Sequence, residues 1–136
     1  MDATKTRQFY EECLTALYIQ RDTGRMAEFY AEDIVSHPSF PGQTPGLKGV
    51  EMTARYFLDT FADISFRIES FSQEGETFSC HLVTTGTHVG NFMGIPATGR
   101  KAEIVDKLRC RIKDGKIAEQ WSNVDTESLQ RQLGAA

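Results

Sequence analysis

Residues 106–125 read DKLRCRIKDGKIAEQWSNVD, and this stretch decides the fold because it predicts a β-hairpin. The turn falls at residues 113–116, where Asp114 tolerates turn geometry and Gly115 supplies the positive φ that a short hairpin loop needs. Strict alternation before the turn predicts an inner face that is apolar except for one aspartate. The members of this inner set are Ile104, Asp106, Leu108, Cys110 and Ile112.

The strand after the turn is predicted to carry a second carboxylate into the interior. Regular alternation places Ile117, Glu119, Trp121, Asn123 and Asp125 on one face. If Ile117 and Trp121 are buried, Asn123 and Asp125 point inward with them. A carboxylate that shares a buried face with a tryptophan is the kind of group whose pKa rises by desolvation, and such a group suits proton transfer near neutral pH.

Asp125 has a second possible role, and the sequence leaves both open. Thr126, Glu127 and Ser128 follow it, so it is also a good N-cap for a helix over residues 128–133. The residue is therefore either an acid/base group or a helix cap.

Composition limits the class of protein. A chain of 136 residues fits one domain, here residues 1–136, that is large enough to bury a core. The net charge of -4 and the absence of a Lys/Arg cluster argue against a nucleic-acid partner. The alternating Lys107, Arg109 and Arg111 are expected on a solvated outer strand face. There is no signal peptide and no apolar run of membrane-spanning length, so we expect no membrane partner and a cytoplasmic location.

The cysteines support the same location. Cys13, Cys80 and Cys110 are odd in number, far apart and in apolar contexts, which predicts neither a disulfide framework nor a zinc site.

The order of patterns along the chain predicts the α+β class. Helical periodicity covers residues 4–22, 25–30 and 50–61, and a short extended piece at 33–38 and a Pro/Gly-rich loop at 38–46 separate the last two. Strand periodicity follows at 64–68, 78–84 and 100–112, with a turn at 74–76. We therefore expect N-terminal helices packed on one face of a curled antiparallel sheet, forming a cone with an apolar pocket inside.

Two histidines and one loop complete the candidate pocket. Continuing the alternation of residues 78–84 places His88 on the core face, and His37 points the same way as Val35. Each histidine is either a ligand-contacting group or a hydrogen-bonded structural residue. The loop at 90–99 lacks the following lysine and the strand-to-helix context of a phosphate loop. Three of its apolar residues are expected at the pocket rim: Phe92, Met93 and Ile95.

Several of these motifs together resemble a known family, the SnoaL-like polyketide cyclases, also called ester cyclases. The resemblance lies in GTHVGNFMGIPATGR at 86–100, DGKIAEQW at 114–121, Asp125 and QLG at 132–134. His37-Pro38 and the helix after Gly49 fit the same pattern, so the likeness covers nearly the whole chain. The family belongs to the nuclear-transport-factor-2-like superfamily, and the resemblance implies its cone-shaped α+β barrel.

The resemblance also implies a reaction, an intramolecular aldol condensation on an apolar small molecule, with no metal or cofactor. An aspartate just past the last strand is the general acid and base in this family, and Asp125 occupies that position. His37, His88, Asn123 and Trp121 are then expected to supply hydrogen-bond donors and the pocket wall.

The chain departs from the family pattern around the tryptophan. Gln120 stands where a histidine is common, and Ser122 stands where an aspartate is common. Asp106 is either a second acid that stays protonated and donates a hydrogen bond, or a structural acid with its own partner. His37 and His88 with Asp106 or Asp125 have no local metal-ligand spacing, so no metal site is predicted.

The same fold admits other functions. A ketosteroid-isomerase-like enzyme, an enzyme like the limonene epoxide hydrolases, and a non-catalytic small-molecule-binding or dimerisation domain are the alternatives. The hydrolases resemble an Asp-Arg-Asp arrangement in the pocket, whereas alternation places Arg109 and Arg111 outside. Family likeness implies a homodimer formed through the sheet. One weakly charged outer series is compatible with such an interface: His81, Val83, Thr85 and Thr87.

Overall fold

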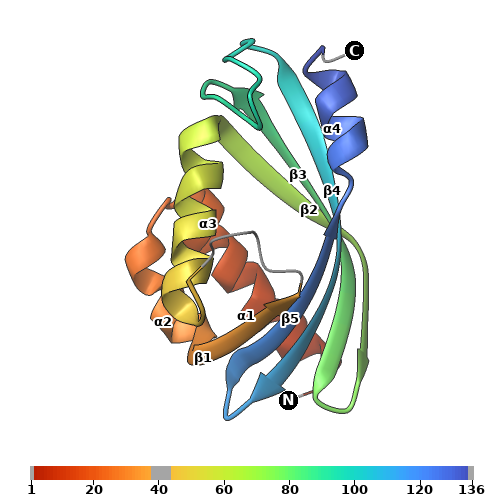
Figure 1. Cartoon of the computed structure of the whole chain (residues 1–136). Helices are drawn as coiled ribbons and strands as arrows, with labels where there is room; N and C mark the ends of the chain where they lie inside the picture. The colour runs from red at the N-terminus through yellow and green to blue at the C-terminus, as the bar shows by residue number, and fades with distance from the viewer. Residues whose placement is uncertain (1, 38–43, 135–136) are drawn as a thin grey trace.

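The computed structural model describes residues 2–37 and 44–134 and confirms the α+β class. A curled sheet bears the N-terminal helices on one side (Figure 1). The predicted loop at 38–46 falls largely on residues 38–43, which lie outside the described residues. The elements in chain order are α1 Ala3–Leu14, the π-helical turn η1 Thr15–Ile19, the 3-10 turn η2 Thr23–Arg25, α2 Met26–Phe29, β1 Tyr30–His37, α3 Leu47–Thr60, β2 Phe61–Glu74, β3 Thr77–His88, β4 Lys101–Lys113, β5 Lys116–Val124 and α4 Thr126–Gln132.

The sheet is mixed, with strand order β1-β5-β4-β3-β2. Strands β2 to β5 form the predicted antiparallel meander, and β1 joins its edge parallel to β5. The prediction of a purely antiparallel sheet is therefore wrong at this one strand. Tyr30 pairs with Ile117 and His37 with Trp121, so the short extended piece before α3 lies beside the last strand of the chain.

Two groups of buried side chains form the core. The first joins α1, α2 and α3 to the sheet and includes Leu14, Phe29, Phe78 and Cys110. The second lies near the end of the sheet that α4 covers, with members Leu58, Phe61, Ile64, Ala102, Ile104, Leu129 and Leu133. Tyr18 packs against both.

The three cysteines are free and buried in the first group. Burial raises the pKa of Cys13 and of Cys80 to about 12, so both are protonated thiols near neutral pH. No helix within residues 2–37 and 44–134 is long and apolar enough to cross a membrane.

A β-bulge near the β4–β5 turn determines which side chains of β5 face inward. Arg111 pairs with Glu119 but Ile112 pairs with Ile117, which leaves Ala118 as an extra residue. An extra residue reverses the alternation beyond it. Gln120, Ser122 and Val124 therefore share the inner face with Ile117, and Glu119, Trp121 and Asn123 turn outward beside Arg111, Arg109 and Lys107. The prediction that Trp121 and Asn123 are buried with Ile117 is wrong for this reason.

The QLG motif at residues 132–134 covers the end of the sheet. Strand β5 ends at Val124, so the edge of β4 beyond it lacks a strand partner. The Gln132 side chain takes that place: its Oε1 accepts from the Glu103 N–H at 2.7 Å, and its Nε2 donates to the Glu103 carbonyl at 2.8 Å. Leu133 is buried in the second core group, and Gly134 has a φ of 87°.

Replacing Gln132 with alanine should lower the free energy of unfolding by about 1–3 kcal/mol, because two hydrogen bonds to Glu103 are lost together. Urea unfolding measures this change. Gln130→Ala on the same helix is the matched control, since among the described residues the Gln130 side chain has a single hydrogen bond, to the Met93 sulfur at 3.8 Å. The control should stay within about 0.5 kcal/mol of the parent. Equal losses in both variants would show that Gln132 has no special role at the edge.

Candidate functional site

Asp106 is the carboxylate that the structure places on the inner face of the sheet. It lies on β4 opposite Val124 at the end of β5. The Ser122 hydroxyl is 2.9 Å from Oδ1 and 2.8 Å from Oδ2, and the Asn123 backbone N–H donates to Oδ1 at 3.0 Å. Burial raises the pKa of Asp106 above its ordinary value, and the bonds from Ser122 and Asn123 oppose this rise without cancelling it. The group is therefore a carboxyl poised to hold a proton at higher pH than a solvated aspartate.

Tyr18 belongs to the same interior region. It lies in the π-helical turn η1, a distortion that is frequent at functional sites, and its ring packs 5.5 Å from that of Phe57. Burial raises the pKa of Tyr18, and the charge of Asp106 raises it further. The phenol is thus a neutral hydroxyl near the carboxylate, and within the described residues it has no hydrogen-bond partner. It is available to donate to a ligand.

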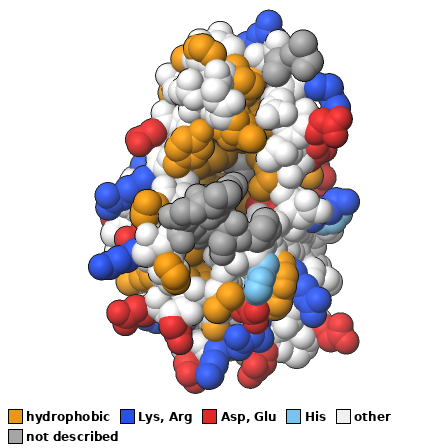
Figure 2. All heavy atoms as spheres, in the orientation of Figure 1, with side chains coloured by type: hydrophobic (Ala, Val, Ile, Leu, Met, Phe, Trp, Pro, Cys, Tyr) orange, Lys and Arg blue, Asp and Glu red, His pale blue; other side chains and the backbone are white. Residues whose placement is uncertain are grey.

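The space between α3 and the sheet has an apolar border. In the orientation of Figure 1, a hollow bordered by hydrophobic side chains opens between α3 and the sheet (Figure 2). Aromatic rings continue from Tyr18 and Phe57: Phe61 lies 5.0 Å from Phe57 and 6.1 Å from Phe92. Phe92 and Ile95 pair with each other and pack on the second core group, whereas Met93 is 59% exposed. Their predicted place at a pocket rim remains a prediction.

His88 is fully buried on the inner face, as alternation predicts. Its ring lies 5.8 Å from that of Phe61. The Thr98 backbone N–H donates to Nδ1 at 3.2 Å, and the Thr98 hydroxyl is 2.9 Å from the same nitrogen. Because Nδ1 accepts, the neutral ring carries its proton on Nε2. This nitrogen is buried and has no hydrogen-bond partner among the described residues, so it is a free donor within an apolar region.

The two interior polar groups are well separated along the sheet. Asp106 pairs with Leu82 on β3, and His88 lies six residues further along that strand. At about 3.3 Å per residue the separation is about 20 Å. His88 therefore cannot exchange a proton directly with Asp106, and a ligand touching both must be elongated.

Asp125 caps α4. Its Oδ1 accepts from the Ser128 N–H at 3.0 Å, and its own N–H donates to the Val105 carbonyl at 3.0 Å. The side chain is exposed, although Asp125 directly follows Val124, the partner of Asp106. The cap role is thus present in the structure, and the acid/base role of Asp125 remains a prediction.

The other residues expected in the pocket lie on the opposite face of the sheet. The His37 ring stacks on Trp121 with centroids 5.3 Å apart, and its Nε2 is 2.7 Å from Glu119 Oε2. The bond from His37 lowers the pKa of Glu119, as does Arg111. Arg109 lies over the outer side of the same tryptophan. The side chains of His37, Trp121 and Asn123 are therefore not brought together with those of His88 and Asp106, although the Asn123 backbone N–H binds Asp106.

Sequence reasoning missed two residues of the interior site. Tyr18 lies within the helical periodicity of residues 4–22, where nothing in the sequence distinguishes it from a core aromatic residue, and strict alternation puts Ser122 on the face opposite Trp121. The strand alternation would have placed Ser122 correctly only with knowledge of the bulge at Ala118. Within residues 2–37 and 44–134, no group of three or more His, Cys, Asp or Glu residues is arranged to hold a metal ion.

Comparison with known proteins gives consistent matches over most of the chain. A family model described as SnoaL-like polyketide cyclase matches residues 4–133. The aklanonic acid methyl ester cyclases DauD of Streptomyces sp. (strain C5) and DnrD of Streptomyces peucetius are each 31% identical over 118 residues, which covers 82% of this chain and 71% and 79% of theirs. Among solved structures, TsrD of Streptomyces laurentii has a TM-score of 0.90 at 26% identity, covering 100% of this chain and 99% of its own. IdmH of Streptomyces antibioticus has a TM-score of 0.79 at 27% identity, covering 99% and 100%.

The raised pKa of Asp106 should make stability depend on pH in a defined direction. A carboxyl whose pKa is higher in the folded state contributes stability below its ordinary pKa of about 3.9 and loses that contribution as pH rises through the raised value. An asparagine side chain cannot ionise, so the melting temperature of Asp106→Asn relative to the parent should rise between pH 4 and pH 7. Ser79→Ala, a non-ionising change on the outer face, should give an offset that is the same at both pH values. A relative melting temperature of Asp106→Asn that falls with pH would refute the raised pKa.

The tautomer of His88 can be tested directly. Nitrogen-15 NMR should show Nδ1 as the unprotonated nitrogen and Nε2 as the protonated one, because the Thr98 N–H needs an acceptor. Exposed His37 and His81 serve as internal references in the same spectrum. A proton found on Nδ1 would mean that Nε2 is an acceptor, and that the interior offers no donor at this position.

Proposed function

The chain belongs to the SnoaL-like polyketide cyclase family, and from this premise we propose that it catalyses an intramolecular aldol-type cyclisation of a polyketide-derived small molecule without a cofactor. The observation that carries the proposal is the Asp106 carboxylate, which is partly buried on the inner face, held by neutral donors and raised in pKa. Carbon acids next to a carbonyl need a base of raised pKa, and the same group must afterwards return the proton.

One carboxylate, that of Asp106, can carry out both proton transfers of the reaction. Asp106 takes a proton from a carbon next to a carbonyl and leaves an enolate. The enolate carbon forms a carbon–carbon bond to a second carbonyl carbon of the same molecule, whose π electrons move to its oxygen. The proton passes from Asp106 to this alkoxide, which regenerates the carboxylate and gives a product that is an isomer of the substrate.

Neighbouring residues have different parts in this scheme. Ser122 and the Asn123 N–H fix the orientation of the carboxylate, as positioning groups. The Tyr18 hydroxyl is a neutral donor suited to the developing oxyanion. His88 is proposed to bind a remote oxygen of an elongated substrate through Nε2–H, since Thr98 occupies its other nitrogen.

The arrangement favours cyclisation over epoxide hydrolysis. An epoxide hydrolase of this fold is expected to place an arginine between two aspartates. Here Arg109 and Arg111 lie on the outer face, with Trp121 and Glu119, and the partners of Asp106 are Ser122 and Asn123.

Aklanonic acid methyl ester, the compound named for two relatives, is the first substrate to test. Conversion to a product of equal mass, and deuterium uptake at the acidic carbon in heavy water, measure the two halves of the reaction. Asp106→Asn should lower both rates by about 10²- to 10⁴-fold, the usual contribution of general acid–base catalysis. Asp114→Asn in the hairpin turn is the matched control and should retain the parent rates.

The Asp125→Asn variant tests which aspartate is the acid/base group: Asp106, as the geometry favours, or Asp125, as the family resemblance implies. If it loses activity while Asp106→Asn keeps it, Asp125 is the proton carrier that the resemblance implies. If the parent protein binds polyketide-like ketones tightly but catalyses neither deuterium exchange nor cyclisation, its function is small-molecule binding and not catalysis. Exchange with double-bond migration would indicate an isomerase.

A further inference from the structure

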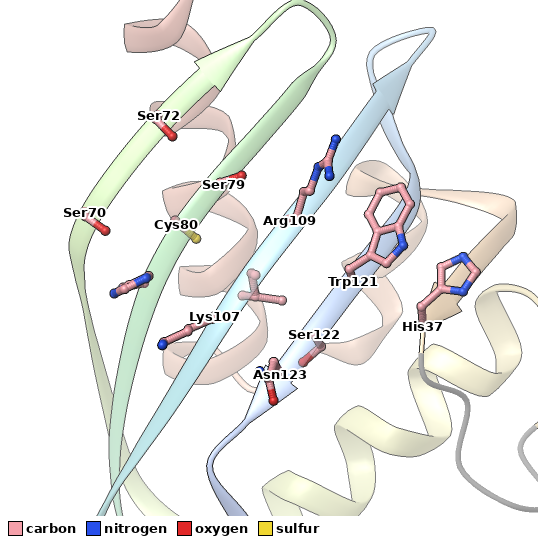
Figure 3. A pocket seen from close by; sticks show the side chains of 12 residues that line it. His37, Ser70, Ser72, Ser79, Cys80, Lys107, Arg109, Trp121, Ser122 and Asn123 are labelled. Carbon is pink, nitrogen blue, oxygen red and sulfur yellow. The ribbon is translucent and has the colours of Figure 1, made fainter.

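The outer face of the sheet carries a groove that the interior chemistry does not use. It is a cavity of about 550 Å³ on the side of the strands away from the helices (Figure 3). Residues paired directly across neighbouring strands build it in two adjacent rows. One row runs Ser72, Ser79, Arg109, Trp121 and His37, and the other runs Ser70, His81, Lys107 and Asn123.

Each row contains one cation, contributed by β4. Lys107 and Arg109 are exposed, and neither has a carboxylate partner among the described residues. No described Asp or Glu side chain lines the groove. The nearby acids are already engaged, because Glu119 is bound by His37 and Arg111, and Arg67 binds Glu69 and Glu103. The groove therefore holds two positive charges that no side chain of residues 2–37 or 44–134 neutralises.

The guanidinium of Arg109 is held in place in advance. It lies over the Trp121 ring, 5.4 Å from the centroid, and His37 stacks on the same ring at an interplanar angle of 13°. Glu119 fixes His37 through a 2.7 Å bond and is itself held by Arg111 at 3.2 Å. An arginine that is already ordered loses less conformational entropy when it binds a ligand.

From these observations we propose that the groove binds a small organic anion through a phosphate or carboxylate group. Lys107 and Arg109 supply the charge, serine hydroxyls on β2 and β3 supply neutral donors, and Trp121 supplies an apolar wall for the organic part. A second copy of the chain is a poorer occupant of the groove. Each copy would present Lys107 and Arg109, and no described Asp or Glu side chain lines the groove to pair with them.

Intrinsic fluorescence tests the site, because Trp121 is the one tryptophan in the sequence. Inorganic phosphate and benzoate are titrated separately, each compared with sodium chloride at equal ionic strength. The expected result is a saturable change in emission with at least one of the two anions and not with chloride. Which of them saturates at lower concentration distinguishes a phosphate site from a carboxylate site.

The double variant Lys107→Gln/Arg109→Gln should weaken this binding at least tenfold. Lys101→Gln/Lys113→Gln removes the same charge from exposed positions of the same strand and should leave the binding unchanged. If chloride changes the emission as much as phosphate and benzoate do, or if both double variants bind equally well, the change in emission is general charge screening and the proposal is wrong.

Self-association is a further outcome that overturns it. Three results together would show that the groove is an interface between copies: the parent sediments as a dimer, Trp121 is shielded from quenching by acrylamide, and no anion binds. Both double variants keep Asp106 and the interior intact, so loss of anion binding with unchanged cyclisation, or the reverse, tells the two proposals apart.

Discussion

The β-bulge at Ala118 is the constraint on which both faces of this sheet depend. A strand has a period of two, so one extra residue exchanges the inner and outer sets of every position that follows it. Without the bulge, Trp121 would lie in the core and Ser122 outside. With it, Ser122 meets Asp106 in the interior, and Trp121 stacks with Arg109 and His37 on the surface.

This dependence explains how far the sequence could be used. The α+β class, the hairpin turn, the inner set of β4 and the burial of His88 all follow from local periodicity and turn chemistry, and the structure agrees with them. Which side chains of β5 face inward cannot be predicted in this way, because no glycine or proline marks the bulge at Ala118. The parallel pairing of β1 is equally hidden, since it joins residues more than eighty positions apart.

The same reasoning applies to the candidate site. Alternation brings Asp106 into the interior, but its partners are visible only once the register of two strands is known. Asp125 carries a strong cap signal in sequence, and a cap needs only the amide of Ser128 nearby. The family position and the local geometry therefore point to two neighbouring aspartates, one exposed and one enclosed.

The surroundings of Asp106 argue that it is more than a structural acid. Buried carboxylates that serve stability are normally paired with a cation, because removing a charge from water is costly. In the described part of the chain Asp106 has only neutral donors, and burial outweighs them in setting its pKa. An apolar residue at this position would avoid that cost. A carboxyl whose pKa is displaced in this way, near enough to the Tyr18 phenol to raise its pKa, is the expected compromise where proton transfer takes precedence over stability.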